Sequence, residues 1–259
     1  MNARSLFLLL LLSPLPAAAE EMSLRIADVR IGPTGGAGEA EFVYTLVNTS
    51  AKTITSWYFS CLDPSYGERS GLGSTGYDGY MTEDLDLGSA ETSLILPGQT
   101  ILHTVRRGPR LGPLKVPYTP QDCAPHLAIF ADATFEGDPG SADSQFQSRA
   151  GNAVDAYRAR LFLQNELDQG VAISEAVDRL IAANLPGSFQ ENVIQGKSRN
   201  SEIISFEANR GQTDYDSIGA ALVLEQLDRH YRLAVKHVPP HWQRKIAAQI
   251  AFDLRQDSP

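Results

Sequence analysis

The sequence predicts an α+β protein, in which an N-terminal antiparallel β-sandwich is followed by a C-terminal helical region. Two observations lead to this prediction. Between residues 24 and 135, apolar and polar residues alternate in short runs separated by Gly and Pro turns, as in antiparallel strands. After residue 140, apolar residues recur every three or four positions, as in amphipathic helices.

The first 19 residues have the layout of an export signal. Arg4 precedes a short apolar run over residues 6–12, and three alanines ending at Ala19 form a small-residue cleavage site. We therefore expect cleavage near Ala19 and a periplasmic or secreted mature chain; the alternative is a buried N-terminal helix. No later run reaches the roughly 18 apolar residues that a membrane helix needs, so we expect no transmembrane segment in the mature chain.

The strand signals begin soon after this segment. Alternation over residues 42–47 and again over 54–61 surrounds a polar turn, which predicts a hairpin. Asn48 in that turn also begins a glycosylation sequon, but we favour its turn role, because Asn side chains bond locally to the backbone. About seven strands are expected in all, and further runs lie at residues 24–31, 93–96, 100–105 and 127–135.

Cys61 and Cys123 both lie in the exported part of the chain. In an oxidising compartment, an even pair of cysteines indicates one disulfide. The alternative is a reactive thiol, for which the only sign is His126 close to Cys123 in the sequence. We favour the disulfide, which would tie the strand of Trp57 to the Pro-rich loop before the last strand.

The helical half begins after the Gly/Pro turn at residues 137–140. We expect a sandwich domain over residues 20–140 and a helical domain or extension over residues 141–259. Apolar stripes predict helices over 146–161, 176–181, 220–238 and 242–254, with Ser174 as a cap of the second and a shorter helix near 202–206.

Three stretches resemble a module of uncharacterised exported bacterial proteins, in which an immunoglobulin- or fibronectin-like sandwich precedes a helical tail. These stretches are residues 42–54, the Leu-Pro-Gly-Gln-Thr turn at 96–100, and Phe-Ala-Asp-Ala-Thr-Phe-Glu-Gly-Asp at 130–138. The resemblance implies an immunoglobulin-like fold for the β-half and the first helix, and it implies no catalytic residue.

Composition and motifs narrow the classes of function. The formal net charge is −9, and no basic stripe crosses the chain, which argues against nucleic acid as a partner. The sequence lacks a Gly-x-Ser-x-Gly elbow, a phosphate loop, a His-Glu-x-x-His motif and a dinucleotide fingerprint. We therefore expect no cofactor. His237 and His241 have metal-ligand spacing, but the two prolines between them argue against one helix carrying both.

Two acidic clusters keep an alternative function open. Glu83, Asp84 and Asp86 form the first cluster, and Asp132, Glu136 and Asp138 form the second. Loop carboxylates of this kind serve as a hydrolase acid pair or as calcium ligands, although neither cluster has the calcium-loop pattern. The alternative function is thus an exported hydrolase, and the default interpretation is that these acids are solvated.

The connection over residues 63–92 is the strongest candidate for binding. It contains six glycines and the tyrosines Tyr66, Tyr77 and Tyr80 in a stretch longer than ordinary loops. Tyr, Gly and Ser together are typical of adaptable contact surfaces; the alternative is a flap whose tyrosines pack on the sandwich. We expect an exported, non-catalytic binding module whose partner is a protein or a glycan.

Overall fold

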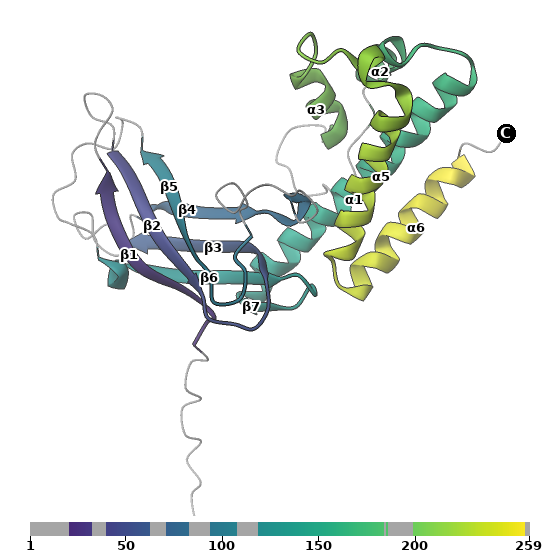
Figure 1. Ribbon diagram of the computed structural model, residues 1–259. Coiled ribbons are helices and arrows are strands. Elements are labelled where there is room, and N and C mark those ends of the chain that lie inside the picture. The colour runs from purple at the N-terminus through teal and green to yellow at the C-terminus, as the bar shows by residue number, and fades with distance from the viewer. Residues whose placement is uncertain are drawn as a thin grey trace, which may run out of the picture.

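The computed structural model describes residues 21–32, 40–62, 71–82, 94–107, 119–183, 185 and 199–256. It is a mixed α+β structure: two antiparallel sheets in the N-terminal part are followed by helices (Figure 1). The predicted fold class is therefore confirmed. Within the described ranges, no helix has the length and apolar content needed to cross a bilayer.

The seven strands of the described residues form two sheets. The three-stranded sheet has the order β1-β2-β5, with bounds Leu24–Gly32, Ala40–Asn48 and Thr100–Arg107. The four-stranded sheet has the order β4-β3-β6-β7, with bounds Gly71–Asp78, Ile54–Leu62, Cys123–Phe130 and Phe135–Gly137. The strands of one sheet cross those of the other steeply in Figure 1, and both sheets contribute side chains to one buried core.

The predicted hairpin over residues 42–61 is wrong, because β2 and β3 lie in different sheets. Asn48 is fully buried at this corner, and its amide nitrogen donates to the carbonyl oxygens of Lys52 at 2.7 Å and Ile95 at 2.8 Å. Its side-chain oxygen accepts from the Ser50 backbone N–H. The Asn48 side chain therefore organises a crossover between sheets, which uses the same turn residues as a hairpin.

Three other strand predictions need correction. In the predicted strand over residues 93–96, the described residues 94–96 form only an isolated bridge, between Ile95 and Ile54. Residues 127–135 are not one strand, because a turn over residues 131–134 separates β6 from β7. In the long connection over residues 63–92, residues 71–78 form strand β4, which pairs with β3. Residues 63–70 and 83–93 lie outside the described part of the chain.

The helices follow directly from the sheet. Gly137, with φ of +98°, ends β7 so close to β6 that a Cβ there would lie 2.0 Å from the His126 carbonyl oxygen. Helix α1 then begins at Pro139, capped by the Asp138 side chain. The helices α1 to α6 span Pro139–Asp168, Ile173–Ala183, Ser201–Ala208, Tyr215–Ile218, Ala220–Lys236 and Pro240–Gln256.

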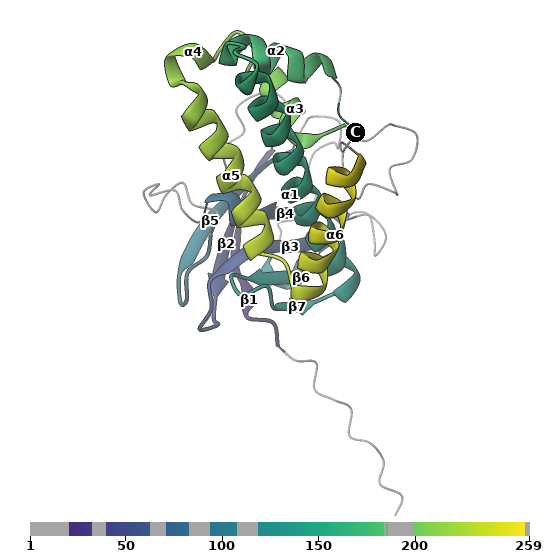
Figure 2. The same cartoon turned by 90° about the vertical axis from the view of Figure 1, so that its right-hand side faces the viewer.

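Helices α1, α5 and α6 pack on the outer face of the four-stranded sheet. Leu127 and Ile129 of β6 share a buried core with Phe146 of α1 and Trp242 of α6. A further core lies among α1, α2, α3, α4 and α5, at the end of the helical region away from the sheets (Figures 1 and 2). The molecule thus has a core between the sheets, a core at the junction of sheet and helices, and a core within the helices.

The predicted disulfide is confirmed: Cys61 and Cys123 are bonded. The two residues face each other on the neighbouring strands β3 and β6 of one sheet. The bridge therefore lies within a sheet, and Cys123 is the first residue of a strand.

Candidate functional site

The three predicted binding tyrosines do not share one environment. Tyr66 lies outside the described residues. Tyr77 is on β4, an edge strand of the described sheet, with 37% of its surface exposed. Tyr80, in a short 3-10 helix over Tyr80–Thr82, is only 2% exposed. Tyr77 is thus partly exposed at a sheet edge, whereas Tyr80 packs inside the protein.

Tyr80 belongs to a buried polar network around Arg149 of α1. Arg149 is fully buried, and it donates to Asp78 Oδ1 at 2.6 Å and to the His237 carbonyl oxygen at 2.8 Å. Its guanidinium carbon lies 4.8 Å from the centre of the Tyr80 ring, within cation–π range. The charge of Arg149 is therefore compensated by a carboxylate, a carbonyl and an aromatic face, which join the sandwich to the helices.

The hydroxyl of Tyr80 is held by the same helix. Asn152 Nδ2 donates to it at 3.1 Å. Burial raises the pKa of Tyr80 to about 12, although the Asn152 hydrogen bond acts in the opposite direction. Tyr80 is therefore neutral at ordinary pH and serves the junction between sheet and helices.

Tyr77 belongs to a different group, which we call the aromatic edge and define as Trp57, Tyr77 and His103. The Tyr77 ring stacks on Trp57 with centroids 6.4 Å apart, and the His103 ring meets Trp57 edge-on at 4.6 Å. Trp57 is 1% exposed. Tyr77 and His103 come from β4 and β5, which are edge strands of the two described sheets. The aromatic edge therefore lies where one side of the sandwich ends.

One residue of the aromatic edge, His103, has a shifted pKa. Burial lowers the pKa of His103 below its ordinary value, which favours the uncharged imidazole near neutral pH. The remaining groups are a phenol ring and an indole. A surface of this kind favours contact with apolar faces and hydrogen bonds from hydroxyl groups.

The described acids of the second predicted cluster each have a structural partner. Asp132 pairs with Lys52 at 2.7 Å; desolvation acts against the charge, but hydrogen bonds from Lys52 and Thr134 lower the pKa of Asp132 to about 2. Glu136 accepts from the backbone N–H and hydroxyl of Ser23 at 2.6 and 2.8 Å.

Asp138 completes this cluster as the cap of α1, and the hydrogen bonds from Ser141 lower its pKa. A glycosidase acid needs a raised pKa, and the pKa values of Asp132 and Asp138 are shifted in the opposite direction. Glu83, Asp84 and Asp86 lie outside the described residues. The second cluster therefore gives the hydrolase alternative no support.

The histidine pair does not form a metal site. His237 is buried beside Tyr80 at the end of α5. His241 is in α6 and lies near Asp143 of α1. Among the described residues, no group of three or more His, Cys, Asp or Glu side chains could hold a metal ion.

One pair of side chains with nucleophile chemistry was missed from the sequence. Ser60 Oγ lies 2.6 Å from His126 Nε2, on the neighbouring strands β3 and β6. An acyl-transfer site also needs N–H donors for the oxyanion. Ser60 lies opposite Ser74 of β4 and Ala124 of β6, so the backbone at this serine is part of the two ladders. We therefore interpret the pair as a cross-strand hydrogen bond.

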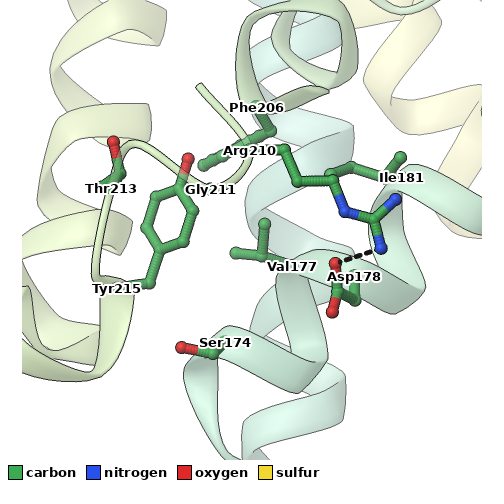
Figure 3. A pocket seen from close by; sticks show the side chains of 9 residues that line it. All are labelled: Ser174, Val177, Asp178, Ile181, Phe206, Arg210, Gly211, Thr213 and Tyr215. Atoms are coloured by element: carbon green, nitrogen blue, oxygen red, sulfur yellow. Dashed lines mark ion pairs between the residues drawn. The ribbon is translucent and has the colours of Figure 1, made fainter. Parts of the chain in front are cut away.

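The helical region contains a hollow of about 290 Å³ between α2, α3 and the turn before α4 (Figure 3). We call it the helical hollow and define it by its lining residues Ser174, Val177, Asp178, Ile181, Phe206, Arg210, Gly211, Thr213 and Tyr215. Sequence reasoning missed it, because the stripes of α2 and α3 predict buried faces without predicting where those faces fail to meet.

Comparison of the chain with protein-family models, with curated proteins and with solved structures gives no match.

Proposed function

We propose that the protein is an exported, non-catalytic binding module that contacts a protein or glycan partner through the aromatic edge. The observation that carries this proposal is the state of Tyr77. Its ring is 37% exposed, and it stacks on a tryptophan that is fully enclosed by the sandwich core. A partner would therefore meet an aromatic face that is already held in place, and little side-chain entropy would be lost on binding.

Two further observations support the other parts of the proposal. Export is supported by the signal-like segment ending at Ala19 and by the disulfide between Cys61 and Cys123, which persists in oxidising compartments. An immunoglobulin-like sandwich is supported by two antiparallel sheets around one core. Edge strands and the loops beside them are surfaces that such sandwiches use for recognition.

The experiment compares matched variants of the mature chain, residues 20–259. Tyr77→Ala should lower the free energy of unfolding by about 1–2 kcal/mol, because most of the ring is buried against Trp57. The folded variant should show capture on a panel of immobilised bacterial glycans and exported proteins that is weaker by about tenfold or more. Tyr80→Ala should lower the free energy of unfolding by about 3–5 kcal/mol, because it removes a buried aromatic ring. Leu102→Ala is the control, since Leu102 is 71% exposed on the neighbouring edge strand.

The outcomes separate the possibilities. Loss of capture with Tyr77→Ala and unchanged capture with Leu102→Ala would support the aromatic edge. Equal capture by wild type and Tyr77→Ala would reject the proposed surface. Turnover of a glycan by the wild-type protein would reject the non-catalytic function and favour the hydrolase alternative.

A further inference from the structure

The helical hollow lies in a part of the molecule that the proposed function does not use. Figures 1 and 2 show α2 and α3 at the end of the helical region away from the sheets, and α4 lies there too in Figure 2. The hollow therefore is separate from the aromatic edge, and each can be tested without the other.

Part of the lining of the hollow is apolar and already formed. Val177, Ile181 and Tyr215 are each less than a tenth exposed, since they belong to the core within the helices. The Phe206 ring meets the Tyr215 ring edge-on, with centroids 5.7 Å apart. Each ring is therefore held by the other, and the hollow does not depend on a side chain moving away to open it.

The mouth of the hollow carries two opposite charges. Arg210 Nη2 and Asp178 Oδ1 form an ion pair at 2.9 Å, and both side chains are more than half exposed. Figure 3 shows this pair on one side of the hollow, Tyr215 and Thr213 on the other side, and Val177 between them. An ion pair as exposed as this one contributes little to stability, so a ligand can open it at small cost.

The paired charges indicate which ligand fits best. A ligand with a single charge would gain an interaction with only one member of the pair. A ligand that carries both an ammonium and a carboxylate group can satisfy Asp178 and Arg210 at once. Its apolar side chain would then lie against Val177, Phe206 and Tyr215, where it would be removed from water.

Size limits the ligand further. A volume of about 290 Å³ is at the small end of the roughly 300–1,000 Å³ typical of small-molecule sites. From the apolar part of the lining, the paired charges and this volume, we infer that the helical hollow binds a small apolar zwitterion, of the class of a free apolar α-amino acid.

The test is isothermal titration calorimetry of the mature chain with L-leucine and L-phenylalanine. Matched ligands each lack one charge: leucinamide lacks the carboxylate, and N-acetyl-leucine lacks the ammonium. Glycine lacks the apolar side chain. We expect saturable binding of leucine or phenylalanine. The affinity for each of the other three ligands should be lower by about tenfold or more.

Variants of the mouth locate the site. Asp178→Asn and Arg210→Gln should each weaken leucine binding by about tenfold and leave the melting temperature nearly unchanged, because both residues are exposed. Arg179→Gln is the control: Arg179 also pairs with acids near the surface of α2, but it does not line the hollow. The control should bind leucine as the wild type does.

Three results would overturn the inference. The first is the absence of saturable heat with both amino acids at millimolar concentration. The second is equal affinity for leucine, leucinamide and N-acetyl-leucine, which would show that the ammonium and carboxylate groups of the ligand do not contribute to binding. The third is unchanged leucine binding by both Asp178→Asn and Arg210→Gln, which would place the site elsewhere.

Discussion

The core between the sheets and the core within the helices are built on different principles. The first contains Phe59 in ring contact with both Trp57 and Tyr44, with a disulfide at its margin. The second consists mostly of smaller aliphatic side chains, and it ends in a hollow whose mouth is an exposed ion pair. The core between the sheets is therefore filled and supports the partly exposed Tyr77 ring, whereas the core within the helices borders an open hollow.

The junction between the two regions differs from both. There, a fully buried cation on α1 is bonded to an aspartate at the end of β4 and to the carbonyl at the end of α5. Apolar packing alone would hold the helices on the sheet in several orientations. A buried charge with several directional partners stabilises one orientation, because any other would leave the charge unpaired.

The largest effect is expected from Arg149→Ala, which tests whether this network couples the two regions. The change leaves the Asp78 carboxylate without its buried partner, so we expect the free energy of unfolding to fall by about 3–5 kcal/mol. Arg160→Ala is the control on the same helix; Arg160 pairs with Asp228 near the surface, and its loss should cost about 1 kcal/mol or less.

The measurement uses the two tryptophans as separate reporters in urea denaturation. Trp57 lies in the sandwich core and Trp242 in the junction core. Each arginine variant is made in a Trp242→Phe and in a Trp57→Phe background, so that one tryptophan reports in each protein. The difference between the two urea midpoints should be larger for Arg149→Ala than for Arg160→Ala. Coincident midpoints, with a loss no larger than that of Arg160→Ala, would contradict the coupling.

A second, smaller effect is expected from removing the disulfide with Cys61→Ser and Cys123→Ser together. The bond spans a sequence separation of 62 residues. Opening a loop of this size typically costs about 2–4 kcal/mol, because the unfolded chain regains conformational freedom. The Trp57 signal should shift more than the Trp242 signal. An equal shift of both unfolding midpoints would show that the sandwich and the helical region unfold as one unit, which would contradict a separate stabilisation of the sandwich by the disulfide.

Much of this architecture could be predicted from the sequence, because period and turn residues are local signals. A strand at residues 24–31, a helix at 220–238 and the disulfide were expected, and the structure has a strand at Leu24–Gly32, a helix at Ala220–Lys236 and the disulfide. Strand partners were not, because Asn48 serves a corner between sheets with the same local hydrogen bonds that it would make in a hairpin. The buried position of Arg149 depends on Asp78, which is 71 residues away in the chain.

The candidate site shows the same limit. The sequence singled out Tyr77 and Tyr80 by composition, and composition cannot distinguish an exposed ring on an edge strand from a ring buried three residues later. His103 and Trp57 join Tyr77 only because β3, β4 and β5 come together in space. A pairing between distant strands leaves no local signal, so the aromatic edge could not be predicted.

The last prediction concerns the pH dependence of the junction, through Tyr80. Burial raises its pKa from 10.0 to about 12. The folded protein therefore holds this proton more tightly than the unfolded chain does. The resulting contribution to stability is fully present below pH 10 and is lost as the pH rises from 10 to 12. Two pKa units correspond to roughly 2–3 kcal/mol.

The matched variant is Tyr80→Phe, which keeps the ring under Arg149 and removes the ionisable group. At neutral pH it should be less stable than the wild type by about 1 kcal/mol, because the Asn152 hydrogen bond is lost. Between pH 10 and 12, the wild type should lose its advantage and then become the less stable protein, since only its unfolded state gains from ionisation of residue 80. Urea denaturation at several alkaline pH values measures the difference. A difference that stays constant over this range would show that Tyr80 ionises at its ordinary pKa and is not enclosed by the junction.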